Sequence, residues 1–179
     1  MVKGSALINM VEYVEKKKGI NGLEILHSEV NKENLIFPQL KNINKSDEFS
    51  ARYFERMLNA SLKSLGTSEE TIHDFGYSYG NETGLGFGSK MLKLESSKRI
   101  VEAITSSFSK YMPLFKIRAE DLSETTFILK ISNLSSKEQR LFVSGYFDSL
   151  LSNFSKKVQK KEEDKESEKI ITLRFIQNL

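Results

Sequence analysis

Apolar residues recur every three or four positions through most of the first 113 residues, which is the spacing of one helix face. The clearest stripe runs from about Ser50 to Leu65. The same spacing predicts further helices over about 5–18, 21–30, 67–75 and 97–112. A capping box opens the helix over 67–75, with Thr67 as its N-cap. About five helices are therefore expected in this part of the chain.

After Pro113 the apolar spacing changes to every second residue, which is typical of strands. LFKIR and TFILKIS predict one hairpin. KKVQKK and EKIITLRFIQ predict a second, in which Ile171, Leu173 and Phe175 share one face. The helix between the two hairpins is expected to begin at another capping box, Ser135-Ser136-Lys137-Glu138.

This order of elements predicts an α+β fold. An N-terminal layer of about five helices is expected to pack on a mostly antiparallel four-stranded sheet of ββαββ order. No linker divides the chain, and 179 residues suit one domain, so we expect a single domain over 1–179. Its helical half is 1–113, and its sheet-containing half is 114–179.

Composition narrows the possible functions. The chain has no cysteine, which excludes disulfides, thiolate metal sites and cysteine nucleophiles. A net charge of +3 is small for a nucleic-acid-binding protein, and no apolar run is long enough to span a membrane. The most basic segment, 156–169, mixes six lysines with five acidic residues, which predicts a solvated surface hairpin. We expect a cytoplasmic protein without a nucleic-acid partner or a membrane span.

The segment GYSYGNETGLGFGSK, residues 76–90, holds five of the ten glycines. A phosphate-binding loop needs GxxxxGK and then Ser or Thr after a buried strand, whereas Lys90 follows Gly88 by two residues and no strand precedes it. A dinucleotide fingerprint needs GxGxxG, and the spacing here is GxGxG. Two interpretations stay open. One is a flexible connection whose glycines permit unusual φ values and close packing, and the other is an aromatic lid over an apolar cavity.

The sequence offers no motif for catalysis or metal binding. It has two histidines, His27 and His73, and neither has a second histidine at helical spacing. No GxSxG motif occurs. We expect both histidines to be surface or partly buried residues, and the protein to lack a catalytic site and a metal.

The segments GSALINMVEYVEKKKG, GLEILHSEV, SARYFERMLNASLKSLG and HDFG resemble the N-terminal half of heme-NO-binding (H-NOX-like) domains. The closing half, with FVSGYFDSLL between two strand pairs, resembles the core that this superfamily shares with 4-vinyl reductase domains and TRAPP vesicle-tethering small subunits. The best-placed anchors of this resemblance are Gly4, Gly19, Gly66, Gly76 and Gly145.

The departures from this family bear on the cofactor. Heme-binding members carry a proximal histidine on the helix before the first strand pair, and the corresponding helix, 97–112, has none. Their Tyr-x-Ser-x-Arg set, which holds the heme propionates, is replaced by ISNLSSKEQR. Heme is therefore not expected, and no other cofactor is implied. The missing cysteines also remove the cysteine cluster of 4-vinyl reductase domains and the acylation site of TRAPP-like subunits.

What the resemblance implies is a divergent member that keeps the scaffold, often dimeric and often enclosing a ligand cavity. We expect a non-enzymatic domain that senses or binds an apolar small molecule in a pocket between the helices and the sheet, and that forms a homodimer. The alternative is a dimeric structural or protein-interaction module resembling TRAPP small subunits. Each residue expected to line the pocket could equally be filled core: Phe54, Met57, Leu58, Phe75, Tyr77, Phe87, Phe108, Tyr111 and Phe115.

Overall fold

The computed structural model describes residues 1–32, 38–91, 96–152 and 158–176, and over 84–91 it describes the backbone alone. The helices are α1 (Gly4–Val30), the short 3-10 helix η1 (Leu40–Asn42), α2 (Ala51–Leu65), α3 (Glu69–Met91), α4 (Ser97–Tyr111) and α5 (Lys137–Ser152). The strands are β1 (Val2–Lys3), β2 (Glu48–Phe49), β3 (Lys116–Asp121), β4 (Thr126–Ser132), β5 (Val158–Lys165) and β6 (Glu168–Phe175).

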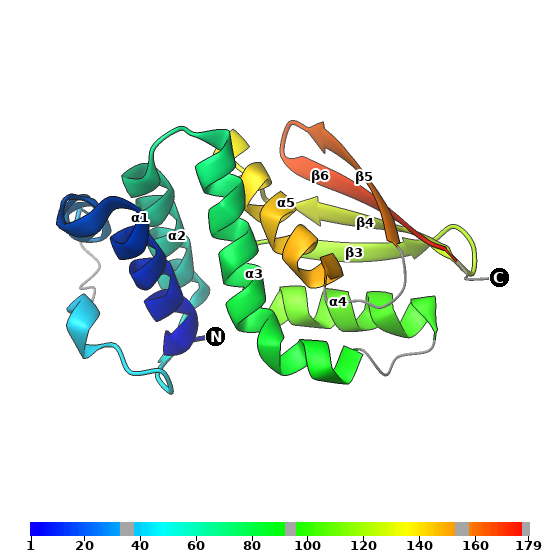
Figure 1. The fold of residues 1–179 in the computed structure, drawn as a ribbon, viewed down its shortest axis with the longest axis horizontal. Helices are drawn as coiled ribbons and strands as arrows, with labels where there is room; N and C mark the ends of the chain where they lie inside the picture. The colour runs from blue at the N-terminus through cyan, green and yellow to red at the C-terminus, as the bar shows by residue number, and fades with distance from the viewer. Residues whose placement is uncertain (33–37, 92–95, 153–157, 177–179) are drawn as a thin grey trace.

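The main sheet has the strand order β3-β4-β6-β5, and every pair in it is antiparallel. Alternate residues of β4 and β6 are buried, so one face of the sheet packs against the helices. Figure 1 places α3 and α5 between the α1–α2 pair at one end and the sheet at the other. The predicted α+β fold with a ββαββ half is therefore confirmed. No helix in the described part of the chain is long and apolar enough to cross a membrane.

The two helices predicted over 5–18 and 21–30 form a single element, α1, with a kink between them. At the kink Gly19 has φ 63° and ψ −154°, a backbone conformation that side-chain-bearing residues rarely adopt. Glycine therefore allows α1 to change direction here without ending.

The helix starts lie one residue later than the capping boxes predict. Ser68, rather than Thr67, caps α3, because its Oγ accepts a hydrogen bond from the Thr71 amide at 3.3 Å. At α5, Ser136 Oγ accepts from the Gln139 amide at 3.2 Å, and Gln139 Oε1 accepts from the Ser135 amide at 2.8 Å. In the second capping box, the side chain that accepts a hydrogen bond from the backbone before the helix is thus that of Gln139 and not that of Glu138.

The glycine-rich stretch is part of α3 and not a loop, so its interpretation as a flexible connection is wrong. Gly76 and Gly80 are helical, and the glycines with positive φ in the described chain are Gly19 and Gly66. The close packing that glycine permits is confirmed, because Gly76 and Gly80 pack against the Phe142 and Tyr146 backbone of α5, and Gly145 of α5 packs against the His73 backbone of α3.

We call Gly76, Gly80 and Gly145 the glycine seam. A Cβ atom added at Gly76 would lie 1.9 Å from the Phe142 carbonyl oxygen, and one at Gly145 would lie 1.9 Å from the His73 carbonyl oxygen. At Gly80 the corresponding distance, to the Tyr146 carbonyl oxygen, is 2.8 Å. The backbones of α3 and α5 therefore touch, and α3 is held directly against the sheet-containing half of the chain (Figure 1).

Candidate functional site

Buried aromatic rings form a continuous path through the molecule. Phe75 packs on Phe142 with ring centroids 4.8 Å apart, and Phe142 packs on Tyr79 at 5.5 Å. Tyr79 lies 6.1 Å from Tyr146, which lies 5.8 Å from Phe108. These rings come from α3, α4 and α5. We call the group the aromatic interior, with the members Phe54, Phe75, Tyr79, Phe108, Phe142, Tyr146 and Phe147.

Most of the residues expected to line a pocket lie in or beside this interior. Those with exposed fractions of 4% or less are Phe54, Met57, Leu58, Phe75, Phe108 and Phe115. Tyr111 is half-buried, and its carbonyl oxygen accepts a hydrogen bond from the Tyr79 hydroxyl at 2.9 Å. Tyr77 lies on the surface of α3, 41% exposed, and its hydroxyl donates to Ser152 Oγ at 3.3 Å. The Phe87 side chain lies outside the described residues, and a pocket lined by this set stays a prediction.

The aromatic interior contains two buried hydroxyl groups that were not predicted from the sequence. The Tyr146 hydroxyl and Ser107 Oγ are buried, with the residues 0% and 1% exposed, and neither makes a hydrogen bond of regular geometry to a described residue. Burial raises the pKa of Tyr146 to about 12, against a smaller lowering by side-chain hydrogen bonding to the nearby hydroxyls of Ser107 and Thr83. Leaving a buried hydroxyl fully unpaired costs about 1–3 kcal/mol, and poorly formed hydrogen bonds recover only part of that cost. This pair of hydroxyls is therefore a place where a ligand's polar group would be stabilised.

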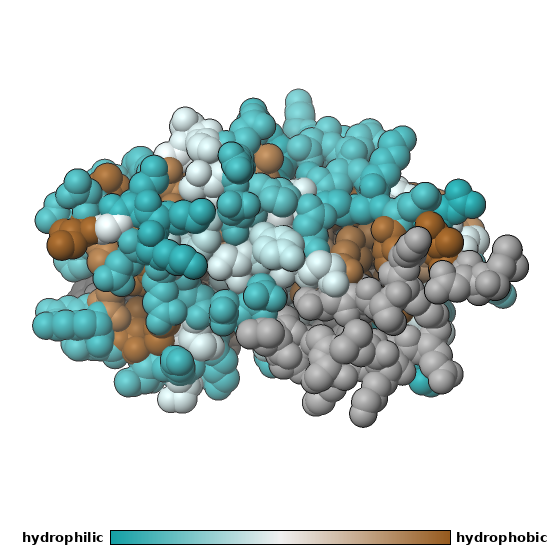
Figure 2. Space-filling model, viewed as in Figure 1, coloured by the Kyte–Doolittle hydropathy of each residue, from teal (hydrophilic) through white to brown (hydrophobic). Residues whose placement is uncertain are grey.

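A second hollow lies on the surface, beside α1 and η1, where hydrophobic side chains gather at one end of the face in Figure 2. It is a groove of about 550 Å³. Its apolar lining comes from Val11, Ile20, Leu23 and Leu40, and its polar lining from Glu24, His27, Ser28 and Lys41. His27 is exposed at this groove, which agrees with its expected place at the surface.

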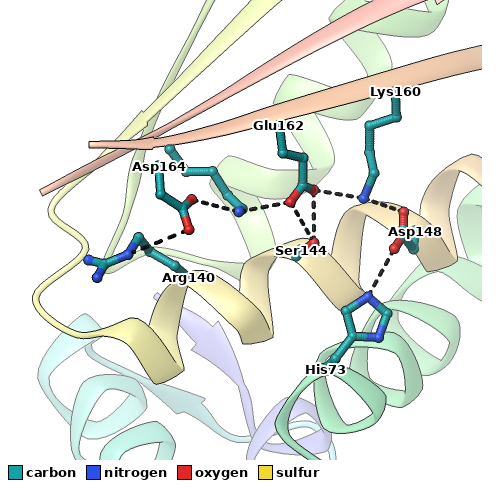
Figure 3. A network of polar contacts seen from close by, with 8 residues as sticks. His73, Arg140, Ser144, Asp148, Lys160, Glu162 and Asp164 are labelled. Carbon is teal, nitrogen blue, oxygen red and sulfur yellow. Dashed lines mark hydrogen bonds and ion pairs between the residues drawn. The ribbon is translucent and has the colours of Figure 1, made fainter. Parts of the chain in front are cut away.

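Charged side chains form a network across α3, α5, β5 and β6 (Figure 3). His73 Nε2 lies 2.9 Å from Asp148 Oδ2, and the other oxygen of Asp148 pairs with Lys160. Lys160 Nζ lies 2.7 Å from Glu162, and Ser144 donates its hydroxyl to Glu162 at 2.8 Å. The Ser144 hydroxyl is hydrogen-bonded to Glu162 and not to His73. Ser144 and His73 therefore do not form the serine–histidine pair of a catalytic nucleophile and its general base.

The network is completed by a buried lysine on β6. Lys169, which is 3% exposed, lies 2.8 Å from both Glu162 Oε2 and Asp164 Oδ1. Arg140 Nε is 3.8 Å from Asp164. We call the whole group the charge network, with the members His73, Arg140, Ser144, Asp148, Lys160, Glu162, Asp164 and Lys169.

The prediction of a solvated hairpin over 156–169 is thus only partly right. β5 and β6 do form a hairpin, but Lys160, Glu162 and Asp164 alternate along β5 and face α5. The signal was present in the sequence, because Lys169 is in phase with the buried Ile171 of β6. The summed charge of the segment did not reveal this, because alternate residues of a strand point to opposite faces and the charges of the two faces were counted together.

We predict that the network makes stability depend on pH through Glu162. Burial alone would raise the pKa of Glu162, but hydrogen bonds from Lys160 and Lys169 outweigh it and hold the pKa below its ordinary value of 4.5. A lowered carboxyl pKa stabilises the fold above pH 4.5, and this stabilisation is lost as the pH falls through the folded-state value. Glu162→Gln should therefore cost about 1–2 kcal/mol at pH 7, and the difference should shrink below pH 4.5.

Urea unfolding of both proteins between about pH 3 and pH 7 measures this difference. Glu163→Gln is the matched control, since Glu163 is exposed on the other face of β5. A difference for Glu162→Gln that stays constant over the whole range would contradict the prediction.

Comparison with known proteins gives matches of structure alone. No protein-family model and no curated protein matches the sequence. The fold is similar to a crystal structure of the Fe(II) unliganded H-NOX protein from K. algicida, with a TM-score of 0.65 and 12% identity over 99% of this chain and 98% of that one. It is also similar to an H-NOX protein from S. oneidensis in the Fe(II)NO state, with a TM-score of 0.63 and 13% identity over 98% and 100%.

A third similar structure is an oxygen-binding H-NOX domain related to soluble guanylate cyclases, with a TM-score of 0.59 and 12% identity over 97% and 95%. Because these identities are low, the likeness shows the fold alone. The predicted H-NOX-like scaffold is thereby confirmed over almost the whole chain.

The described residues do not fit a histidine-ligated heme. The side chains that α4 buries are Ile100, Val101, Ile104, Ser107 and Phe108, and none can ligate iron through a ring nitrogen. His73 is hydrogen-bonded to Asp148, and His27 lies at the surface groove. Among the described residues no group of three or more acidic or histidine side chains could hold a metal. Absence of heme from the protein stays a prediction.

Proposed function

We propose that this protein is a non-enzymatic sensory domain of the H-NOX fold, which binds an apolar small molecule in the aromatic interior without heme. The observation that supports this most directly is the pair of neighbouring hydroxyls, Tyr146 and Ser107, which are buried in an apolar core and make no hydrogen bond of regular geometry to a described residue. Ligand sites are mainly apolar and hold a few polar groups that orient the ligand. The ligand would be mostly apolar and would carry one hydrogen-bonding group.

Binding in this interior would act on helices that are already in close contact. Tyr146 follows Gly145 of the glycine seam directly, and Asp148 of the charge network lies less than one turn further along α5. A ligand that shifts the Tyr146 ring would therefore move α5 against α3 and against β5. We propose that this coupling allows ligand binding in the interior to change the position of α5 relative to its neighbours.

Native mass spectrometry and titration with indole, which is mostly apolar and has one N–H donor, test the proposal. We expect a retained small molecule or stoichiometric indole binding. Tyr146→Phe removes only the hydroxyl and should weaken indole binding about 2- to 10-fold. Tyr77→Phe removes an exposed tyrosine hydroxyl from α3 and should leave binding unchanged. An apo mass with no indole binding, or equal affinities for wild type and Tyr146→Phe, would overturn it.

Hemin titration tests the second part of the proposal. Since α4 carries no histidine, we expect no sharp Soret band and no stable complex after removal of free hemin. A sharp Soret band at one heme per chain would contradict this part. The same mass spectrum reports the oligomeric state, and so it tests the expected homodimer and the alternative of a dimeric interaction module.

A further inference from the structure

Strand β3 forms one edge of the main sheet, and among the described residues no other strand pairs with its outer side. Five of its six residues are exposed. One of them is Ala119, which lies opposite the buried Leu129 and so on the face of the sheet that the helices cover. Helix α4 runs beside β3 in Figure 1 but leaves this residue open to solvent. An open edge strand offers a row of backbone donors and acceptors to another strand.

The hydrogen bonds of the first hairpin show which backbone groups of β3 face outward. The Leu122 amide donates to the Thr126 carbonyl oxygen at 2.9 Å, so these two residues are a hydrogen-bonded pair. Hydrogen-bonded and non-hydrogen-bonded pairs alternate along an antiparallel ladder. The even-numbered residues of β3 therefore bond to β4, and the N–H and C=O groups of Ile117, Ala119 and Asp121 point away from the sheet.

The charges of β3 are complementary to those of a second copy in one register. Because side chains alternate between faces, two identical strands can extend one sheet symmetrically only about an axis that passes through a residue. With Ala119 on this axis, Arg118 lies opposite Glu120 of the second copy, and Glu120 lies opposite Arg118 of the second copy. An axis at any other residue of β3 would place like charges opposite each other, which is destabilising.

Both side chains of this charge pair can reach a partner. Glu120 contacts Lys130 through Oε1, at 2.7 Å, so its Oε2 is left to accept from a second arginine. Among the described residues Arg118 has no ion-pair partner. The other edge strand, β5, does not offer such a register. An axis at any residue from 160 to 165 would place a charged side chain opposite its own copy.

We propose that the protein forms a symmetric dimer in which the β3 strands of two copies pair antiparallel about an axis at Ala119. The two four-stranded sheets then become one continuous sheet, and two Arg118–Glu120 pairs form on its open face. The interface is small, so we expect a weak dimer with a Kd of about 10 μM. It lies on the outer edge of the sheet, and its formation requires no ligand in the aromatic interior.

A single cysteine tests the axis, because the chain has none of its own. The two copies of Ala119 would be a hydrogen-bonded pair, whose Cα atoms lie about 5.5 Å apart, within the range of a disulfide. Under mild oxidation, Ala119→Cys should therefore become a covalent dimer. Lys161→Cys, on the exposed face of β5, is the matched control and should stay mostly monomeric.

Charge reversal tests the register by sedimentation equilibrium of the full chain. Arg118→Glu and Glu120→Arg should each weaken dimerisation by at least about 10-fold, because like charges then lie opposite each other. An equimolar mixture of these two variants should restore the dimer, since every opposed pair is again of opposite sign. Lys161→Glu makes the same reversal on β5 and should dimerise like the wild type. Thermal unfolding checks that each variant is folded.

A wild-type chain that stays monomeric up to about 200 μM would overturn the inference. A dimer that both charge reversals leave intact would do so as well, because another surface would then hold it together. Equal cross-linking of Ala119→Cys and Lys161→Cys, or a mixture of the reversed variants that stays monomeric, would exclude this register. None of these results would change the expected binding of indole in the aromatic interior.

Discussion

Replacing Gly145 or Gly76 with alanine is expected to destabilise the protein by about 3 kcal/mol or more. The added methyl group would lie 1.9 Å from a backbone carbonyl oxygen in each case, that of His73 for Gly145 and that of Phe142 for Gly76. A backbone atom cannot rotate away as a side chain can. Helices α3 and α5 would have to separate, which would open the packing of the aromatic interior between them.

Urea unfolding measures this effect, and the seam supplies its own graded comparison. Gly80→Ala should cost less, about 1–2 kcal/mol, because its new methyl would lie 2.8 Å from the Tyr146 carbonyl oxygen. Asn81→Ala, on the exposed side of α3, should change stability by no more than about 0.5 kcal/mol. If Gly145→Ala were as stable as Asn81→Ala, the two helices could not be in backbone contact.

Removing the charge of Lys169 is the second change with a large expected effect. Lys169→Met keeps the aliphatic stem and removes the ammonium group that Glu162 and Asp164 share. Breaking a buried ion pair costs about 3–5 kcal/mol, and since Asp164 is 49% exposed we expect about 2–3 kcal/mol here.

The matched control is Lys161→Met, which removes an exposed lysine from the neighbouring strand and should be nearly neutral. Adding Glu162→Gln and Asp164→Asn to Lys169→Met should recover part of the loss, because the two side chains that lose the Lys169 ammonium are then uncharged. Equal unfolding midpoints for Lys169→Met and Lys161→Met would show that the buried ammonium adds nothing to stability.

The fold could be predicted because the periods of its apolar residues differ clearly between the two halves. The stripe over 50–65 became α2, and the alternation of Ile171 with Leu173 became the buried face of β6. The glycine-rich stretch was misjudged for a physical reason. Glycine is a poor helix former by itself, and it is the contact with α5, far along the chain, that makes it necessary in α3.

For the candidate site, the sequence predicted only which residues are buried. The spacing of apolar residues identified Phe54, Phe75 and Phe108 as inward-facing, but this spacing does not distinguish residues that line a pocket from residues of a filled core. The Tyr146 and Ser107 hydroxyls come together from α5 and α4, which are separated by a hairpin in sequence. No local sequence pattern predicts that two such distant residues meet in the folded protein.

The glycine seam also sets an order for chain folding. The contact between His73 and Gly145 joins residues that are far apart in sequence, with α4 and a complete hairpin between them. During synthesis α3 emerges well before α5, so its glycine-lined face has no cover until the first hairpin and α5 have been made. The helical half is therefore not expected to reach its final packing as a fragment, because α3 needs α5 to cover its glycine-lined face.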